Sequence, residues 1–249
     1  MTPGRSDAAP MVWRQAFTVR AYEVGPGETA RLLTLCDYVQ EAAGEHARAL
    51  GVERFTLPSG VGAWVLHRLR IEVGRRPRWR ETVTVETWPS AHDGLRARRD
   101  ALLLDAGGGV VARAATHWLV LDLARRRPLR LPDAVTRLAP PDRPFALPLP
   151  DAPTALAGDA ETELRATVGR ADLDRNAHAN NVRFAAWALD AGPPDQNPAS
   201  LDLAFRAEAV RGDALVSRAR PDGGAVAHEI VRERDGATLA VARSTWAAP

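Results

Sequence analysis

The spacing of apolar residues along the chain switches between a strand-like and a helix-like period. Residues 17–23 alternate apolar and polar positions as in a strand, and a Gly-Pro-Gly run then ends the pattern. From a predicted N-cap at Thr29 to Gly51, apolar residues recur every three or four positions, which predicts a helix with one apolar face. Strands are then expected over residues 63–73, 81–88, 95–104 and 112–123.

The same order of elements returns in the second half of the chain. A strand is expected over residues 164–168, a helix over 180–189 and a loop over 193–198. One helix followed by several antiparallel strands is an α+β pattern, here present twice. The expected strands that follow the loop span residues 201–208, 214–220, 225–232 and 238–246.

A proline-rich segment separates the two halves. Eight prolines fall between residues 127 and 153, and proline cannot donate a hydrogen bond to a strand ladder. This composition predicts a linker. We therefore expect an N-terminal domain over residues 11–135, a linker over 136–160 and a C-terminal domain over 161–249.

Composition narrows the class of protein. The chain has no lysine, and its 33 arginines nearly balance 31 acidic residues, which argues against a nucleic-acid partner. The single cysteine, Cys36, excludes an intramolecular disulfide and fits a reducing compartment, so a cytoplasmic location is expected. The first residues lack the apolar stretch of a secretory signal, and no apolar run approaches the roughly 18 residues of a membrane span.

One polar segment stands out as candidate chemistry. Asp174, Asn176 and His178 are spaced two residues apart, so an extended backbone would point all three side chains to one side. The helix predicted to begin near Asn180 would place free N–H groups beside them. The alternative is that Asp174 and Asn176 are turn or cap residues and that His178 is an ordinary residue before a helix.

A resemblance becomes specific at these residues. The segment from Asp174 to Trp187 resembles the Asp-x-Asn-x-His-x-Asn-Asn-x-x-(Tyr/Phe)-x-x-Trp signature of acyl-(acyl carrier protein) thioesterases. Residues 205–209, Phe-Arg-Ala-Glu-Ala, resemble that family's Tyr-Arg-Arg-Glu-Cys strand. Five further segments resemble its N-terminal domain: residues 39–46, 64–68, 77–79, 86–89 and 98–100.

The resemblance implies a double hotdog fold, in which each of two antiparallel sheets wraps a central helix. It also implies hydrolysis of fatty acyl-acyl carrier protein to a free fatty acid, with no cofactor and no metal. The family's catalytic residues fall on Asp174, Asn176, His178 and Glu208.

One position departs from the family pattern and bears on the mechanism. The family's cysteine is Ala209 here, and Cys36 lies on the apolar face of the first predicted helix, where a thiol is usually core. We therefore expect water as the nucleophile, with Glu208 and His178 deprotonating it, Asn176 and helix N–H groups holding the thioester oxygen, and Asp174 orienting its neighbours. Either carboxylate could be the base.

Partners and alternatives follow from the same features. Arginines cluster over residues 75–80, 96–99 and 125–130, and each cluster is either a solvated surface or a docking site for an acidic carrier protein. An acyl-CoA thioesterase and a non-catalytic acyl-binding protein are the competing functions. The acyl pocket is expected in the first domain, and the chain is expected to be a monomer or a homodimer, because two hotdogs already form the usual pair.

Overall fold

We describe the protein from a computed structural model, in which residues 9–57 and 60–247 are placed. The first eight residues, where no secretory signal is expected, lie outside the described residues. Among the described helices, none is both long and apolar enough to cross a membrane.

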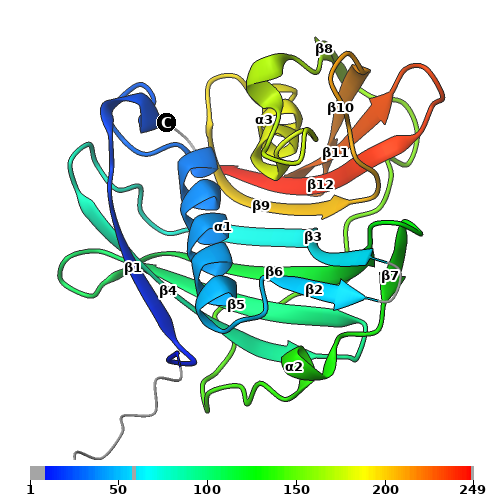
Figure 1. Ribbon diagram of the computed structural model, residues 1–249. Helices are drawn as coiled ribbons and strands as arrows, with labels where there is room; N and C mark the ends of the chain where they lie inside the picture. The colour runs from blue at the N-terminus through cyan, green and yellow to red at the C-terminus, as the bar shows by residue number, and fades with distance from the viewer. Residues whose placement is uncertain (1–8, 58–59, 248–249) are drawn as a thin grey trace, which may run out of the picture.

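The described strands form one antiparallel sheet made of two halves (Figure 1). The first half has the order β1 (Trp13–Thr18), β4 (Thr82–His92), β5 (Arg96–Leu104), β6 (Val110–Asp122) and β3 (Gly60–Val73). The second half continues with β9 (Asn197–Phe205), β12 (Thr238–Ala247), β11 (Ala225–Arg232), β10 (Ala214–Asp222) and β8 (Thr162–Thr167). Two short strands lie off this path: β2 (Arg54–Leu57) pairs with β3, and β7 (Arg127–Leu129) pairs with β6.

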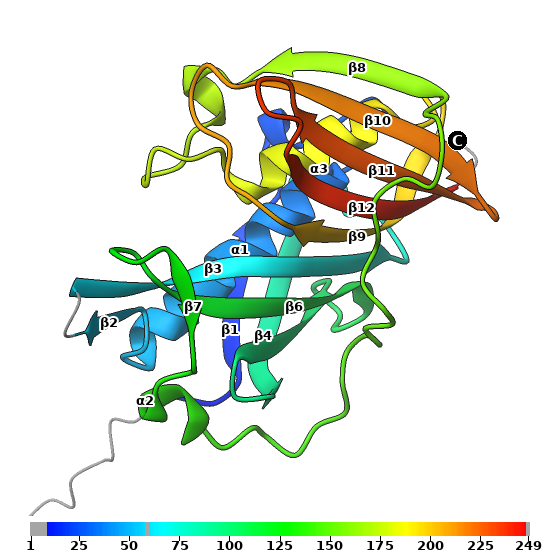
Figure 2. The same cartoon turned by 90° about the vertical axis from the view of Figure 1, so that its right-hand side faces the viewer.

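Each half of the sheet packs around one helix. The helix α1 (Leu32–Ala49) crosses the first half, and α3 (Asn181–Asp190) lies against the second half (Figures 1 and 2). Their apolar faces join a shared core with the inward side chains of both half-sheets. Three shorter elements complete the chain: the one-turn helix α2 (Asp133–Thr136) and the 3₁₀ turns η1 (Ala21–Glu23) and η2 (Arg170–Asp172). This is the α+β double hotdog arrangement that the sequence predicts.

The two halves repeat the same path in detail. In both, an edge strand leads through a 3₁₀ turn into a tight turn closed by an isolated bridge, and the helix then begins. The first turn is closed by the Gly25 N–H donating to the Thr29 carbonyl at 2.9 Å. The second is closed by the Asp174 N–H donating to the His178 carbonyl at 2.7 Å. The first half therefore holds the same turn with glycine where the second half has aspartate.

A buried arginine fixes the junction between the half-sheets, where β3 pairs with β9. The Arg68 guanidinium, 5% exposed, contacts the Asp202 carboxylate at 2.6 and 2.8 Å. It also donates to the carbonyls of Pro150 and Asp151 at 2.7 and 3.1 Å. The proline-rich segment, which has no helix or strand from residue 137 to 161, is thus held against the junction as it runs from α2 to β8 (Figure 2).

Several predicted boundaries were wrong. The first strand is Trp13–Thr18, because the chain turns into η1 before Glu23. Arg31, and not Thr29, is the residue before α1. The predicted loop over residues 193–198 is shortened, since β9 already begins at Asn197. The sequence also missed β7, which tolerates Pro128 because it is a short strand paired on one side only.

Candidate active site

The segment from Asp174 to His178 is a tight turn. Besides the 2.7 Å closure, the Ala177 N–H donates to the Asp174 carbonyl at 3.1 Å, and Ala177 has a φ of 61°. The prediction of an extended backbone with three side chains on one side was therefore wrong. The cause is Asp174, whose Oδ1 accepts the N–H groups of Asn176 at 2.8 Å and His178 at 3.2 Å, and so stabilises the turn.

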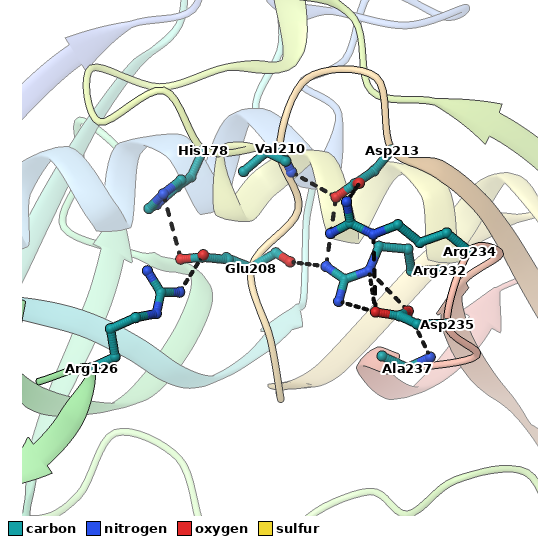
Figure 3. A network of polar contacts seen from close by, with 9 residues as sticks. All are labelled: Arg126, His178, Glu208, Val210, Asp213, Arg232, Arg234, Asp235 and Ala237. Carbon is teal, nitrogen blue, oxygen red and sulfur yellow. Dashed lines mark hydrogen bonds and ion pairs between the residues drawn. The ribbon is translucent and has the colours of Figure 1, made fainter.

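The four candidate residues form two pairs. The Asn176 amide donates to Asp174 Oδ2 at 3.3 Å within the turn, and Asn176 is exposed. His178 Nε2 lies 3.4 Å from Glu208 Oε2, although the two residues are far apart in the sequence (Figure 3). The pairs are joined by two hydrogen bonds between Asp174 and His178: the Asp174 N–H donates to the His178 carbonyl, and the His178 N–H donates to Asp174 Oδ1. Both side chains of the second pair are open to solvent, with 42% of His178 and 35% of Glu208 exposed.

Backbone pairing brings Glu208 to this place. Glu208 follows the end of β9, outside the strand in which it was predicted to lie. The Ala179 N–H donates to the Ala209 carbonyl at 2.9 Å, and His178 forms an isolated bridge with Val210. The turn before α3 and the segment after β9 are therefore held side by side, and this pairing sets the histidine opposite the glutamate.

A polar network supports the segment that carries Glu208 from its other side (Figure 3). The Glu208 carbonyl accepts a hydrogen bond from Arg232 Nη1 at 3.2 Å. Arg232 is itself held by Asp235 at 2.8 Å and Asp213 at 3.6 Å. Asp213 also accepts the Val210 N–H at 3.0 Å. The backbone on both sides of Ala209 is thus anchored to β11 and to the start of β10.

The sequence missed one residue of the site, Arg126. It lies in the turn between β6 and β7, in the first half of the protein, and pairs with Glu208 Oε1. The other carboxylate oxygen, Oε2, faces His178. No sequence signal relates two residues that are 82 positions apart; only the pairing of the two half-sheets brings them together.

The start of α3 differs from the expected supply of free N–H groups. Asn180 precedes the helix, and its side chain accepts the Val182 N–H at 2.9 Å. The Asn181 amide donates to Gln40 of α1 at 2.8 Å, which ties α3 to the first half. The Asn180 side chain thus caps α3, so the Val182 N–H is not available to a substrate oxygen.

Neither position considered for a thiol supplies a nucleophile. Ala209 is fully buried within the hydrophobic core. Cys36 is also fully buried, and burial raises the pKa of its thiol far above its usual range. The expectation that Cys36 is a core residue is confirmed.

A cleft of about 1020 Å³ begins at the turn and extends along α1 into the first half. Asp174 and Asn176 border it, while Trp64 and Trp118 line it from β3 and β6. The indole N–H groups of these tryptophans are satisfied by the Val52 carbonyl at 2.7 Å and Thr116 Oγ1 at 2.9 Å. Arg99 also lines the cleft and donates to His46 at 2.9 Å.

The arginine clusters are neutralised only in part by ion pairs within the described residues, so a solvated surface and a docking site for an acidic carrier protein both stay predictions. In the third cluster, Arg125 and Arg126 are both paired, whereas Arg127 makes no ion pair within the described residues. The ion pairs of the first two clusters are Arg75 with Glu81 and Asp105, Arg96 with Asp93, and Arg98 with Asp100.

The fold agrees with solved structures of one class of enzyme. The structure of a 12:0-ACP thioesterase from Umbellularia californica matches with a TM-score of 0.82 and 26% identity, over 97% of this chain and 99% of that chain. An acyl-ACP thioesterase structure from Bacteroides thetaiotaomicron matches with a TM-score of 0.83 at 22% identity, over 95% and 98% of the two chains. These matches place the protein among the double hotdog thioesterase folds.

The sequence then identifies the family. Residues 10–138 match the acyl-ACP thioesterase N-terminal domain, and residues 157–248 match the C-terminal domain. The chain belongs to the acyl-ACP thioesterase family. A chloroplastic palmitoyl-acyl carrier protein thioesterase of Cuphea hookeriana is 30% identical over 95% of this chain, and the match spans 62% of that relative's length.

Proposed function

We propose that the protein hydrolyses the thioester of fatty acyl-acyl carrier protein and releases a free fatty acid. Membership of the family supports this activity, as do the relatives, which are named as hydrolases of palmitoyl-, dodecanoyl- and oleoyl-acyl carrier proteins. The geometry that carries the proposal is the contact between His178 Nε2 and Glu208 Oε2 at 3.4 Å, at the end of the turn whose Asp174 and Asn176 border the cleft.

Water is the nucleophile in this proposal. Glu208 and His178 take a proton from a water molecule as its oxygen bonds to the acyl carbon. The carbon–sulfur bond then breaks, and the proton is returned to the leaving sulfur, so that the products are a fatty acid and the free thiol of the carrier. Both residues are partly exposed, so water and the thioester can approach the pair from solvent.

Asp174 and Asn176 support this step without being the base. Both Asp174 oxygens already accept N–H groups of the turn, so Asp174 orients Asn176 and His178. The Asn176 side chain is exposed at the border of the cleft, where its remaining amide hydrogen can donate to the thioester oxygen. Of the two candidate carboxylates, Glu208 is therefore the one we assign as general base.

The cleft along α1 is the proposed site of the acyl chain. It starts at the turn that bears Asn176 and is lined by residues of α1 and by residues of β3, β5 and β6 in the first half-sheet. Tryptophan rings whose N–H groups are already satisfied present apolar faces to an alkyl chain.

The test compares Glu208→Gln with Asp174→Asn, which both remove a carboxylate charge at similar size. We expect Glu208→Gln to lower kcat at least about 100-fold, and Asp174→Asn to lower it less. Turnover is followed on acyl-acyl carrier proteins of six to eighteen carbons. A larger loss in Asp174→Asn would move the base to Asp174, and no large loss in either variant would refute the mechanism.

The carrier is tested separately. The same acyl chain is presented on acyl carrier protein and on coenzyme A, and the proposal expects higher kcat/KM with the carrier protein. The reverse preference would favour an acyl-CoA thioesterase, and binding without hydrolysis of either substrate would favour an acyl-binding protein.

Location and assembly complete the proposal. We propose a cytoplasmic enzyme, which the single buried thiol supports, and a monomer, since both half-sheets are supplied by one chain. Cell fractionation and sedimentation measure these two properties; a homodimer is the alternative assembly.

A further inference from the structure

The ion pair between Arg126 and Glu208 joins the two halves of the protein at the site. Arg126 is in the turn between β6 and β7, which follows a strand of the first half, whereas Glu208 follows β9 in the second half. Arg126 contacts Oε1 of the same carboxylate whose Oε2 faces His178 at 3.4 Å (Figure 3). The carboxylate therefore lies between a permanent cation and the imidazole.

The turn that presents Arg126 is itself ordered. Asp122 Oδ1 accepts the N–H groups of Ala124 and Arg125, each at 3.0 Å, and Arg126 has a φ of 53°. After the turn, Arg127 pairs back with Asp122 in the β6–β7 ladder. A left-handed backbone at a non-glycine residue is strained, and such strain persists where the surrounding structure holds it.

We infer that Arg126 is a positioning residue of the hydrolase: it holds the Glu208 carboxylate turned toward His178. The inference rests on the function proposed above. The charged or titratable groups around Glu208 are Arg126 and His178 at its carboxylate and Arg232 at its carbonyl, with Asp213 and Asp235 beyond Arg232. Among the described residues, Arg126 is the permanent cation paired with this carboxylate.

Arg127 provides a matched control. It is the next residue of the same cluster, is exposed, and makes no ion pair within the described residues. If Arg126 only attracted an acidic carrier protein, Arg126→Ala and Arg127→Ala would raise KM for acyl-acyl carrier protein to a similar extent. They would then leave the turnover of a carrier-free thioester unchanged.

The experiment measures kcat and KM on an acyl-acyl carrier protein and on the N-acetylcysteamine thioester of the same acyl chain. We expect Arg126→Ala to lower kcat about 10-fold or more on both substrates, because a displaced base is a poor one. Arg127→Ala should keep the kcat of the wild type on the carrier-free substrate.

Two further variants separate positioning from folding. Arg126→Lys keeps the charge and should recover part of the lost kcat. Adding Arg126→Ala to Glu208→Gln should cause no further loss, because the arginine acts through the carboxylate. An unchanged kcat in Arg126→Ala, or a loss of equal size in the Glu208→Gln background, would overturn the inference.

Failure of the inference can be told apart from failure of the proposed function. If the wild type hydrolyses no acyl thioester, the proposed function fails. The contact can still be followed in the NMR chemical shifts of the His178 ring, which should differ between wild type and Arg126→Ala and stay unchanged in Arg127→Ala. Hydrolysis by the wild type together with normal turnover and unchanged His178 chemical shifts in Arg126→Ala would reject the inference alone.

Discussion

At the residue scale, one carboxylate decides the path of the backbone at the site. Asp174 accepts two N–H groups from the residues that follow it and so bends the chain into a turn. Because of that bend, His178 lies opposite Val210, within reach of Glu208, and not in line with Asn176. An extended segment would carry the same Asp174, Asn176 and His178. Only the turn brings His178 next to Glu208, which comes from a distant part of the sequence.

The neighbour of Glu208 gives a prediction about the nucleophile. Ala209→Cys would place a thiol at the family's cysteine position, but the side chain there is fully buried in the core. We expect turnover to change by less than about threefold, since a buried thiol behaves as a small apolar group. Hydrolysis measured before and after treatment with a thiol-alkylating reagent checks this. Activity that rises with the new cysteine and is lost on alkylation would contradict it.

At the element scale, the pairing of β3 with β9 depends on a buried charge. Arg68 bridges Asp202 of β9 and two carbonyls of the linker, so one side chain holds three segments together. A buried ion pair contributes little beyond its desolvation cost, but the loss of one partner leaves the other uncompensated. The junction is therefore sensitive to removal of a single charge.

We expect Arg68→Ala to lower the free energy of unfolding by about 3–5 kcal/mol, because it strands the Asp202 carboxylate. Arg70→Ala is the control on the same strand: Arg70 pairs with the more exposed Glu72, and its loss should cost about 1 kcal/mol or less. Urea unfolding of both variants measures the difference. Equal destabilisation by the two substitutions would show that the buried pair does not hold the junction.

The sequence predicts an element well when the interactions that form it lie close together along the chain. The helix over residues 32–49 and most strands follow from a repeating apolar pattern, which the chain itself carries. The sequence also places His178 and Glu208 in one site, through the family resemblance. It could not give the turn at Asp174, where side-chain hydrogen bonds override the spacing, nor the pairing of Arg126 with Glu208, which exists only once the two half-sheets have met.

At the scale of the whole molecule, buried histidines make stability depend on pH. Burial, together with the nearby Arg99 guanidinium, lowers the pKa of His46 to about 4. Burial also lowers the pKa of His228 to about 4. Both ring nitrogens of His46 are hydrogen-bonded: Nε2 lies 2.8 Å from the Pro10 carbonyl, and Nδ1 accepts from Arg99. A second proton would have to bind at Nδ1, where it would displace the Arg99 donor.

The direction of the effect follows from linkage. Between a folded pKa of about 4 and an unfolded value of about 6.5, the unfolded chain binds more protons. The free energy of unfolding should therefore fall as the pH drops from 7 toward 4.5. Urea unfolding at pH 7 and pH 5 measures the difference, which should be smaller in His228→Gln. An identical pH dependence in that variant would rule out His228 as a contributor.

The repeated turn has a consequence for how the protein can change. In the first half, Gly25 and Thr29 close the same turn that Asp174 and His178 close in the second half, yet they bring no acid and no imidazole. The two halves share one architecture but contribute different parts of the site. The second half carries Asp174 and His178, and the first half lines most of the cleft. Under the proposed function, mutations that reshape this cleft can change the preference for chain length while His178, Glu208 and the turn at Asp174 stay the same.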